Sequence, residues 1–368
     1  MRILINGSFA PSLIGFRGPL IRMLCDRGDE VHVTSPEIGA AVRTELERYG
    51  AVVHEIALSR TGFSVGADLA YFLALRRLMQ RVRPDFVLGY TIKPNIWGSL
   101  AARSLSIRSA SMVTGLGYAF APSAKLSRRL LTRLSQGLYR MATAANARVV
   151  FQNPDDLADF VAAGCLADPD KAGIVDGSGV DTEHYAPAPL PPGAHFLLIA
   201  RLLGAKGVRE YARAAACLRA RHREWSFRLV GFLDDGPDAI SAAELAEIEA
   251  AGVEFLGRHD DVRPAIRQAS VFVLPSYREG TPRSVLEAMA MGRPIVTTDA
   301  PGCRETVRDG VNGRIVPVGD AKALAAAMET LGADSALREA MGAESLRIAR
   351  SKYAVERVNA ALLDLLGI

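Results

Sequence analysis

Short runs of apolar residues alternate along the chain with stretches in which apolar positions recur every three or four residues. In the first half, the apolar runs lie at 3–5, 31–33, 52–54 and 86–88. Such runs are typical of buried strands, and the stretches between them are typical of amphipathic helices. This alternation predicts an α/β fold in which a parallel sheet is covered by helices.

The alternation stops at residues 186–193, where the prolines favour an extended connector. It restarts behind them, with apolar runs at 196–199, 227–230, 253–255 and 271–274. We therefore predict two Rossmann-like domains, 1–185 and 194–350, joined by the linker 186–193. Residues 351–368 predict a last amphipathic helix, which needs a surface to cover and is expected to cross back to the first domain.

The composition is that of an ordinary globular protein of 368 residues, with 49% hydrophobic and 23% charged residues. The four cysteines show no C-x-x-C spacing, so they favour a reducing compartment over a zinc site or a disulfide framework. The apolar run at the amino terminus is too short for a signal peptide, and no apolar run is long enough to predict a membrane span. We expect a cytoplasmic protein.

The positive charge is concentrated in the first half. Residues 1–185 contain 21 Lys and Arg against 17 Asp and Glu, and residues 86–154 contain no acid at all. Within this acid-free stretch, leucines recur every fourth residue at Leu126, Leu130, Leu134 and Leu138, while Lys125, Arg129 and Arg133 recur on another face. The pattern predicts a basic amphipathic helix.

Two interpretations of this helix stay open. In the first, the leucines face the core beneath a solvated cationic face; in the second, the helix docks on an anionic membrane. The length of the acid-free stretch favours the second interpretation, with Lys93, Lys125, Arg128, Arg129 and Arg133 as the predicted acceptor and membrane contacts. Few aromatic residues and no recognisable module argue against nucleic acid as a partner.

Ligands of open parallel sheets bind at the carboxyl ends of the strands, so the loops after strands are the candidate sites. The first such loop, 6–11, continues to glycines at 15–18 that can bring a phosphate to a helix amino terminus, although glycine after a strand is more often a simple turn. Neither G-x-G-x-x-G nor G-x-x-x-x-G-K-[ST] is present, which argues against the NAD-dependent and ATP-dependent classes.

Two cations stand in the first loop of the second domain. Arg201 and Lys206 follow the apolar run 196–199 and precede a predicted helix. An arginine fork, a mobile lysine and a helix amino terminus together suit a diphosphate, although two solvated loop cations would look the same in sequence.

Two acids lie in the segment 274–290, which again follows an apolar run and opens a helix. Glu279 lies in the loop and Glu287 lies eight residues further on, about two turns along at 3.6 residues per turn. The spacing predicts that both carboxylates face one cleft. A carboxylate within an apolar helix needs hydrogen-bond donors, which a ribose diol would supply.

Together these motifs resemble the retaining family 4 glycosyltransferases. The resemblance rests on Glu279 and Glu287, on Arg201 and Lys206, and on the segments 179–181, 257–262 and 298–313, and it covers nearly the whole chain. It implies the GT-B fold, in which two Rossmann-like domains face each other across a cleft, with a nucleotide-sugar domain at 194–350 and an acceptor domain at 1–185.

The resemblance also implies residue roles. Arg201 and Lys206 hold the donor diphosphate, Glu287 the ribose, Glu279 the sugar, and residues from Arg258 to Val262 the base. The predicted donor site is completed by Gly15, Gly280 and Thr281, and the predicted catalytic residues are Glu279, Lys206 and Arg201. The family generally needs no metal, and we expect no metal or other cofactor.

The segments 91–98 and 114–120 look like a bacterial branch of the family that extends polyprenyl-diphosphate-linked sugars. We therefore predict transfer from a UDP-sugar, with an N-acetylhexosamine as one candidate sugar, to such an acceptor at the inner face of the cytoplasmic membrane, with peripheral association. Many family members carry a histidine where this chain has Met112–Gly117, and no histidine here fills that place. A sugar-nucleotide epimerase and a non-catalytic nucleotide-sugar-binding regulator remain the alternatives.

Overall fold

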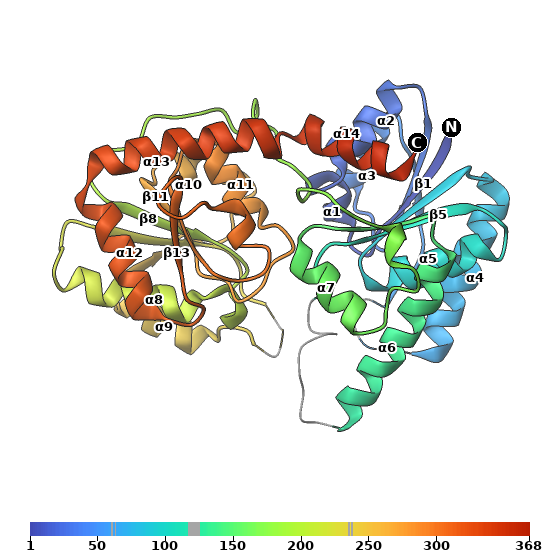
Figure 1. Cartoon of the computed structure of the whole chain (residues 1–368), viewed down its shortest axis with the longest axis horizontal. Coiled ribbons are helices and arrows are strands. Elements are labelled where there is room, and N and C mark those ends of the chain that lie inside the picture. The colour runs from blue at the N-terminus through green and yellow to red at the C-terminus, as the bar shows by residue number, and fades with distance from the viewer. Residues whose placement is uncertain (60–61, 63, 117–125, 235, 237) are drawn as a thin grey trace. The chain divides into compact units, whose positions relative to one another are not determined.

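The structure is a computed structural model of the whole chain, and it describes all residues except 60–61, 63, 117–125, 235 and 237, with only the backbone of 126–130. It divides into two compact units (Figure 1). Unit 1 comprises Met1–Ser178 and Asn359–Ile368, and unit 2 comprises Gly179–Val358. Each unit contains one parallel sheet with helices on both faces, so the predicted α/β fold class is confirmed.

The sheet of unit 1 has seven strands in the order β3-β2-β1-β4-β5-β6-β7. The strands are β1 (Arg2–Asn6), β2 (Glu30–Ser35), β3 (Val52–Glu55), β4 (Phe86–Tyr90), β5 (Arg108–Val113), β6 (Arg148–Phe151) and β7 (Ala172–Ile174). The helices are α1 (Ala10–Gly15), α2 (Gly18–Asp26), α3 (Ala40–Arg48), α4 (Val65–Val82), α5 (Ile92–Arg103), α6 (Leu126–Ala145), α7 (Pro154–Ala162) and the 3-10 turn η2 (Pro169–Lys171).

The apolar runs of unit 1 are continuous because both sheet faces are covered. Ile3 and Ile5 of β1 point to one face, where they pack with α1, α2, α3 and the carboxyl half of α14 (Val355–Leu366). Leu4 points to the other face, where it packs with α4 and α5. One alternating strand therefore contributes to two separate cores.

The sheet of unit 2 has six strands in the order β10-β9-β8-β11-β12-β13. The strands are β8 (His195–Ile199), β9 (Ser226–Val230), β10 (Val253–Phe255), β11 (Val271–Leu274), β12 (Ile295–Thr298) and β13 (Gly313–Val316). The helical segments are η3 (Gly204–Lys206), α8 (Val208–Arg219), α9 (Ala242–Ala250), α10 (Arg263–Arg267), α11 (Arg283–Ala290), η4 (Arg304–Thr306), α12 (Ala321–Ala333), α13 (Ser335–Ile348) and the π-helix η5 (Ala349–Tyr353).

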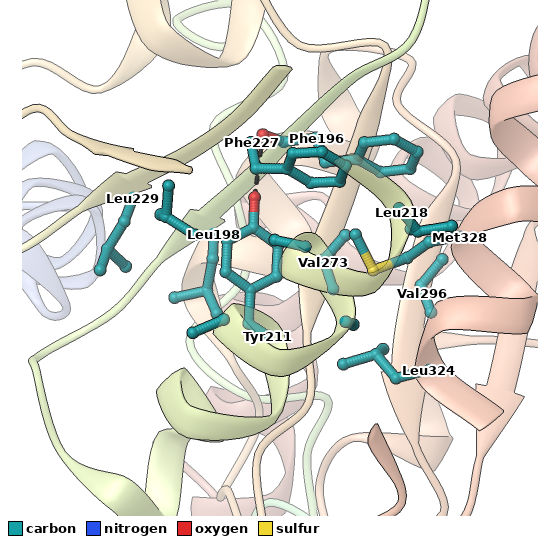
Figure 2. Packing of buried hydrophobic residues seen from close by; sticks show 14 of the residues in the cluster. Phe196, Leu198, Tyr211, Leu218, Phe227, Leu229, Val273, Val296, Leu324 and Met328 are labelled. Carbon is teal, nitrogen blue, oxygen red and sulfur yellow. Dashed lines mark hydrogen bonds between the residues drawn. The ribbon is translucent and has the colours of Figure 1, made fainter. Parts of the chain in front are cut away.

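One core of unit 2 lies between this sheet and helices α8, α9 and α12 (Figure 2). The rings of Phe196 and Phe227 stack at 5.2 Å between centroids. The hydroxyl of Tyr211 enters this apolar layer and donates to the carbonyl oxygens of Phe196 and Arg228 at 3.0 and 3.1 Å. A buried hydroxyl needs such a partner, so the position of α8 is fixed by polar as well as apolar contacts.

Both sheets are doubly wound, and each has one point where the strand order reverses. In unit 1 this point lies between β1 and β4, and in unit 2 it lies between β8 and β11. The loops after these strand pairs separate to opposite faces of the sheet and leave a crevice at the carboxyl edge, which is the general ligand site of open α/β sheets. These two edges are therefore where ligand-binding groups are expected.

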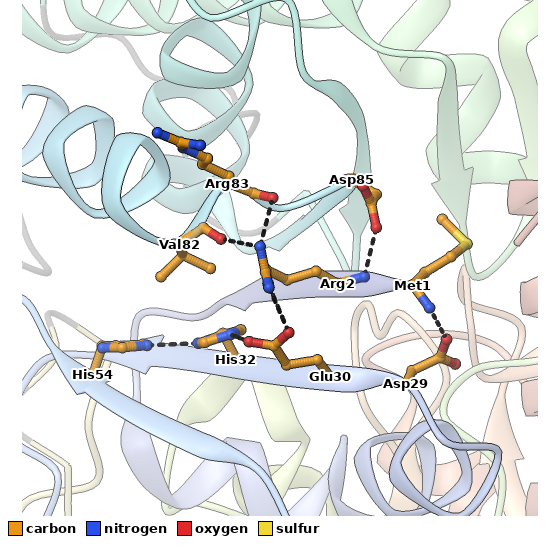
Figure 3. A network of polar contacts seen from close by, with 9 residues as sticks. All are labelled: Met1, Arg2, Asp29, Glu30, His32, His54, Val82, Arg83 and Asp85. Carbon is orange, nitrogen blue, oxygen red and sulfur yellow. Dashed lines mark hydrogen bonds and ion pairs between the residues drawn. The ribbon is translucent and has the colours of Figure 1, made fainter.

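A polar network fixes the opposite, amino-terminal end of β1 (Figure 3). Arg2 donates through Nε to Glu30 at 2.8 Å and through Nη1 to the Val82 carbonyl at 2.8 Å. His32 lies between Glu30 and His54, at 2.9 Å from each. These contacts tie β1, β2, β3 and the end of α4 together away from the carboxyl edge.

Candidate active site

The switch point of unit 2 brings together two loops that are far apart in sequence. β8 and β11 pair in parallel, with Phe196 opposite Val271, so the loops 200–207 and 275–282 leave the same edge of the sheet. The Tyr277 amide donates to the Ala205 carbonyl at 2.9 Å. Gly207, between η3 and α8, has φ of 72°, and a Cβ there would lie 2.1 Å from the Pro275 carbonyl oxygen, so this approach requires glycine.

Lys206 and Glu279, both singled out from the sequence, meet at this edge. Lys206 Nζ lies 2.5 Å from Glu279 Oε1, and the Ser276 hydroxyl donates to the same carboxylate oxygen at 2.7 Å. The lysine and glutamate side chains are only 19% and 14% exposed. At this burial, the interaction between the two charges is much less screened than it would be at the surface. The structure thus presents a positioned cation and a positioned carboxylate in one place.

Glu287 occupies a second polar position, in the second turn of α11. It is buried at 7% exposure, Arg283 donates to its Oε1 at 2.8 Å, and Tyr185 interacts electrostatically with its carboxylate. Burial raises the pKa of the Glu287 carboxyl, and the Arg283 charge opposes this shift. Arg283 lies four residues before Glu287, so the helical i,i+4 rule could have found it, whereas nothing in the sequence pointed to Tyr185.

Helical periodicity does not relate Glu279 to Glu287, contrary to the prediction from their spacing of about two turns. Helix α11 begins at Arg283, so Glu279 precedes it and has no place on its faces. The two acids have different partners, because Glu279 is held by Lys206 and Ser276 whereas Glu287 is held by Arg283. Loop geometry, rather than helical periodicity, determines the position of Glu279.

The remaining predicted donor residues are more exposed. Arg201 is 52% exposed and contacts Asp234 at 3.0 Å. Arg258 is 69% exposed and lies over the Phe232 ring at 5.6 Å. Val262 packs partly against the second core of unit 2, Gly280 and Thr281 are partly buried in the loop before α11, and Gly15 ends α1 in unit 1.

The predicted acceptor and membrane residues have different surroundings. Lys93 is buried and lies 2.7 Å from Asp68 of α4, so it is not on an exposed surface. Arg133 is exposed on α6. Lys125 and the side chains of Arg128 and Arg129 lie outside the described residues.

The cations of the acid-free stretch 86–154 are not all uncompensated, because several have partners elsewhere in the chain. Lys93 is paired with Asp68, which lies outside that stretch of sequence. Arg108 and Arg148 donate to the carbonyl oxygens of Leu366 and Leu365 at 3.0 and 3.3 Å, where the carboxyl end of α14 carries partial negative charge. Folding brings these partners from distant segments, which a count along the chain does not register.

The chemistry available in unit 2 is charge stabilisation by positioned groups. Cys303, the thiol beside this site, is fully buried, and burial together with the Glu279 charge raises its pKa to about 12. It therefore stays protonated near neutral pH.

Among the described residues no group of three His, Cys, Asp or Glu side chains could hold a metal ion. Over the same residues, none of the helices has the length and hydropathy needed to cross a membrane.

Comparison with known families agrees with this geometry. Residues 14–153 match the model described as glycosyl transferase 4-like, and residues 193–334 match the model described as glycosyl transferases group 1. The chain is 29% identical over 353 residues to N,N'-diacetylbacillosaminyl-diphospho-undecaprenol alpha-1,3-N-acetylgalactosaminyltransferase of Campylobacter jejuni, with 92% of this chain and 91% of that protein covered. The chain belongs to the family 4 glycosyltransferases.

Other glycosyltransferases match over most of their length. Putative glycosyltransferase EpsD of Bacillus subtilis is 28% identical, with 91% of this chain and 88% of that protein covered. The solved structure of Anabaena HepE in complex with UDP and glucose superposes with a TM-score of 0.78 at 20% identity, and it covers 100% of this chain and 99% of that one. The fold of this glycosyltransferase is therefore GT-B, as the sequence motifs implied.

Proposed function

We propose that this glycosyltransferase moves a sugar, with an N-acetylhexosamine as one candidate, from a UDP-sugar to a polyprenyl-diphosphate-linked saccharide in bacterial surface-glycan or glycoprotein-glycan assembly. The observation that carries the proposal is the contact of Glu279 with both Lys206 and Ser276 at the switch point of unit 2. The C. jejuni relative is named for an undecaprenyl-diphosphate-linked acceptor, and the HepE structure holds UDP and glucose. Both names support the substrate classes.

The proposed mechanism rests on charge. Cleavage of the sugar–phosphate bond places negative charge on the departing diphosphate, and Lys206 and Arg201 stabilise it more in the transition state than in the ground state. Glu279, held by Lys206 and Ser276, accepts hydrogen bonds from the sugar hydroxyls, and Glu287 accepts from the ribose. The acceptor hydroxyl attacks from the face that UDP leaves, which retains the anomeric configuration, and no metal is needed.

We also propose that the enzyme docks peripherally on the inner membrane through α6. On this helix Leu131 and Leu134 are 39% and 53% exposed, next to exposed Arg133, while Ser135 and Tyr139 are buried. The described part of the leucine repeat therefore does not lie wholly in the core. An exposed apolar and cationic helix face suits an anionic lipid surface.

The catalytic proposal is tested by measuring UDP release from a UDP-sugar panel with and without a lipid-diphosphate saccharide, in buffer with and without EDTA. The proposal is supported if UDP release requires the acceptor and if mass spectra show a product heavier by one sugar. NMR should show that the anomeric configuration of the transferred sugar is unchanged. Epimer formation without acceptor indicates the epimerase, and donor binding without either product indicates the regulator. Loss of activity in EDTA would overturn metal independence.

Membrane docking is tested by flotation with anionic liposomes at low and high salt. Replacing Arg128, Arg129 and Arg133 with Glu should release the protein, because each cation near an anionic surface contributes about 1 kcal/mol. A charge-matched control changes Arg213, Arg219 and Arg223 of unit 2 to Glu. Unchanged flotation of the α6 variant, or equal loss in the control, would contradict docking through α6.

A further inference from the structure

Arg17 is a buried cation at the switch point of unit 1. It is 2% exposed and is the residue before the first turn of α2. Its guanidinium carbon lies 5.3 Å from the centre of the Tyr90 ring, at the end of β4. Burial lowers the pKa of Arg17 to about 10, so the guanidinium remains charged at neutral pH.

This charge has no acidic partner in the part of unit 1 that the structure describes. Arg17 forms no ion pair or side-chain hydrogen bond there, and its buried Nε has no acceptor. The residues of unit 1 that are not described, 60–61, 63 and 117–125, contain no Asp or Glu. A buried charge without a counter-charge costs several kcal/mol, so proteins keep such a group chiefly where a ligand supplies the opposite charge.

Arg293 of unit 2 shows what a structural buried arginine looks like in this chain. It is fully buried, and burial likewise lowers its pKa to about 10. Its guanidinium, however, donates to four carbonyl oxygens, those of Ala188, Pro189, Ile266 and Arg267, at 2.7 to 3.2 Å. Arg17 has burial of the same kind with none of this hydrogen bonding.

The helices around Arg17 add positive potential. Arg17 precedes α2, a helix of nine residues, and a cation at a helix amino end is at the unfavourable end of the dipole. Thr91, which follows Tyr90, precedes the twelve-residue α5 and makes no side-chain cap. Its φ of 72° is unusual for threonine, and backbone strain of this kind is concentrated at functional sites.

Short contacts bind the loops of the switch point together. The Ser8 and Thr91 hydroxyls lie 2.7 Å apart, and Ser12 Oγ lies 2.9 Å from Tyr90 Oη. A Cβ at Gly7 would lie 2.3 Å from Tyr90 Oη, so only glycine fits beside that ring. The loop after β1 and the loop after β4 therefore form one preorganised edge around Arg17.

We propose that Arg17, the amino end of α2 and the turn between β4 and α5 form a binding site in unit 1 for a phosphoryl group of a substrate. An arginine fork and helix amino ends are the groups that bind phosphate oxygens. The inference rests on the proposed function for its two candidate sources, the diphosphate of the lipid-linked acceptor and the diphosphate of the nucleotide. Arg17 was not among the residues that the sequence singled out.

Binding is tested with inorganic diphosphate, without turnover. All proteins compared carry Lys206→Ala, which removes the lysine at the unit 2 switch point. Their thermal unfolding is followed during a titration with diphosphate. With Arg17 present, the midpoint should rise by about 2 °C or more at saturating diphosphate, because the anion binds only the folded state. Arg17→Met should abolish the rise, and Arg17→Lys should keep part of it.

The controls separate a ligand site from a structural role. In buffer free of phosphate and diphosphate, Arg17→Met should be as stable as the parent, whereas Arg293→Met should lose stability. Arg17→Gln serves if Arg17→Met does not fold, and it should lose the diphosphate response as well. An equal rise in midpoint with and without the Arg17 charge would overturn the proposal.

Kinetics identify the source of the phosphoryl group. Arg17→Met should raise by about 10- to 100-fold the KM of whichever substrate contributes the phosphate, since a hydrogen bond to a charged group is lost. A rise for the lipid acceptor alone assigns the site to the acceptor, and a rise for the donor alone assigns it to the nucleotide. Unchanged KM values for both would overturn the site, while transfer activity itself would still support the glycosyltransferase proposal.

Discussion

The two units share one topology but fill their switch points with opposite charge arrangements. In unit 2 three cations near the switch point each have an acid close by, as Lys206 has Glu279, Arg283 has Glu287 and Arg201 has Asp234. In unit 1 Lys93 has Asp68, but Arg17 has no acid among the described residues. These three cations of unit 2 are therefore compensated within their own unit, whereas the buried charge of Arg17 in unit 1 is not.

The difference shows that burial alone does not reveal the role of a charged side chain. Arg17 and Arg293 are equally buried, and the pKa of each is lowered to about 10. Only Arg293 has its donors satisfied by carbonyl oxygens. The hydrogen-bond partners, and not the degree of burial, distinguish an arginine that holds the fold together from one that is available to a ligand.

The largest effect on stability is expected when the buried Lys93–Asp68 ion pair of unit 1 is broken. Asp68→Asn leaves Lys93 buried without its counter-charge, and breaking a buried pair in this way costs about 3–5 kcal/mol. The free energy of unfolding in urea measures the loss. The double variant Asp68→Leu with Lys93→Met removes both charges and should recover most of it; a double variant as unstable as Asp68→Asn would show that the pair itself is not responsible.

The next largest effect is expected on activity in unit 2. Lys206→Ala should reduce turnover about 100- to 1,000-fold, because one positioned donor to a developing anion is worth about 2.7–4 kcal/mol. Steady-state UDP release at saturating acceptor measures it. Lys322→Ala, which removes an exposed lysine of α12, is the control and should be neutral. Turnover near that of the parent in Lys206→Ala would refute the diphosphate assignment.

The strands and the loop residues of unit 2 could be predicted because they depend on local pattern. Apolar runs identified β8 and β11, and the residues just after them include Lys206 and Glu279. Their contact could not be predicted from local pattern, because it spans 73 residues and depends on β8 lying beside β11. The assignment of the acceptor to the first domain and the donor to the second stays a prediction.

The pairing of the charged residues in unit 1 could not be predicted from the sequence, for the same physical reason. Asp68 lies 25 residues before Lys93, and α4 must pack against α5 before the two can pair. The lack of an acidic partner for Arg17 among the described residues is harder still to predict, because the sequence does not show which arginines are buried. Charges can be counted along a chain, but their compensation is determined by tertiary packing.

A smaller effect should separate the two acids of unit 2. Glu287→Gln keeps the shape but removes the charge beside Arg283, and it should weaken UDP binding about 10-fold, or about 1.4 kcal/mol. Glu279→Gln should lower kcat more than it lowers UDP affinity, because it is assigned to the sugar. Calorimetry with UDP and steady-state kinetics measure the two quantities. Equal loss of UDP affinity in both variants would contradict this division of roles.

The smallest effect concerns the polar network at the amino-terminal end of the unit 1 sheet, where His32 and His54 stack (Figure 3). Burial, and then the charges of His32, Arg81 and Arg43, lower the pKa of His54 from 6.5 to about 4. The unfolded chain therefore binds this proton first as the pH falls, so stability is lost progressively between pH 6.5 and about 4 and is unaffected above pH 7.

His54 is partly accessible, so screening reduces its contribution to about 1 kcal/mol at pH 5. Urea unfolding measures the free energy of unfolding at pH 7.5 and at pH 5. The decrease between these two pH values should be smaller in His54→Gln than in the parent by about 1 kcal/mol, because glutamine cannot take up the proton. The same loss in both proteins would show that His54 does not couple folding to pH. A smaller loss of unfolding free energy in the variant would show that His54 couples folding to pH below its usual pKa.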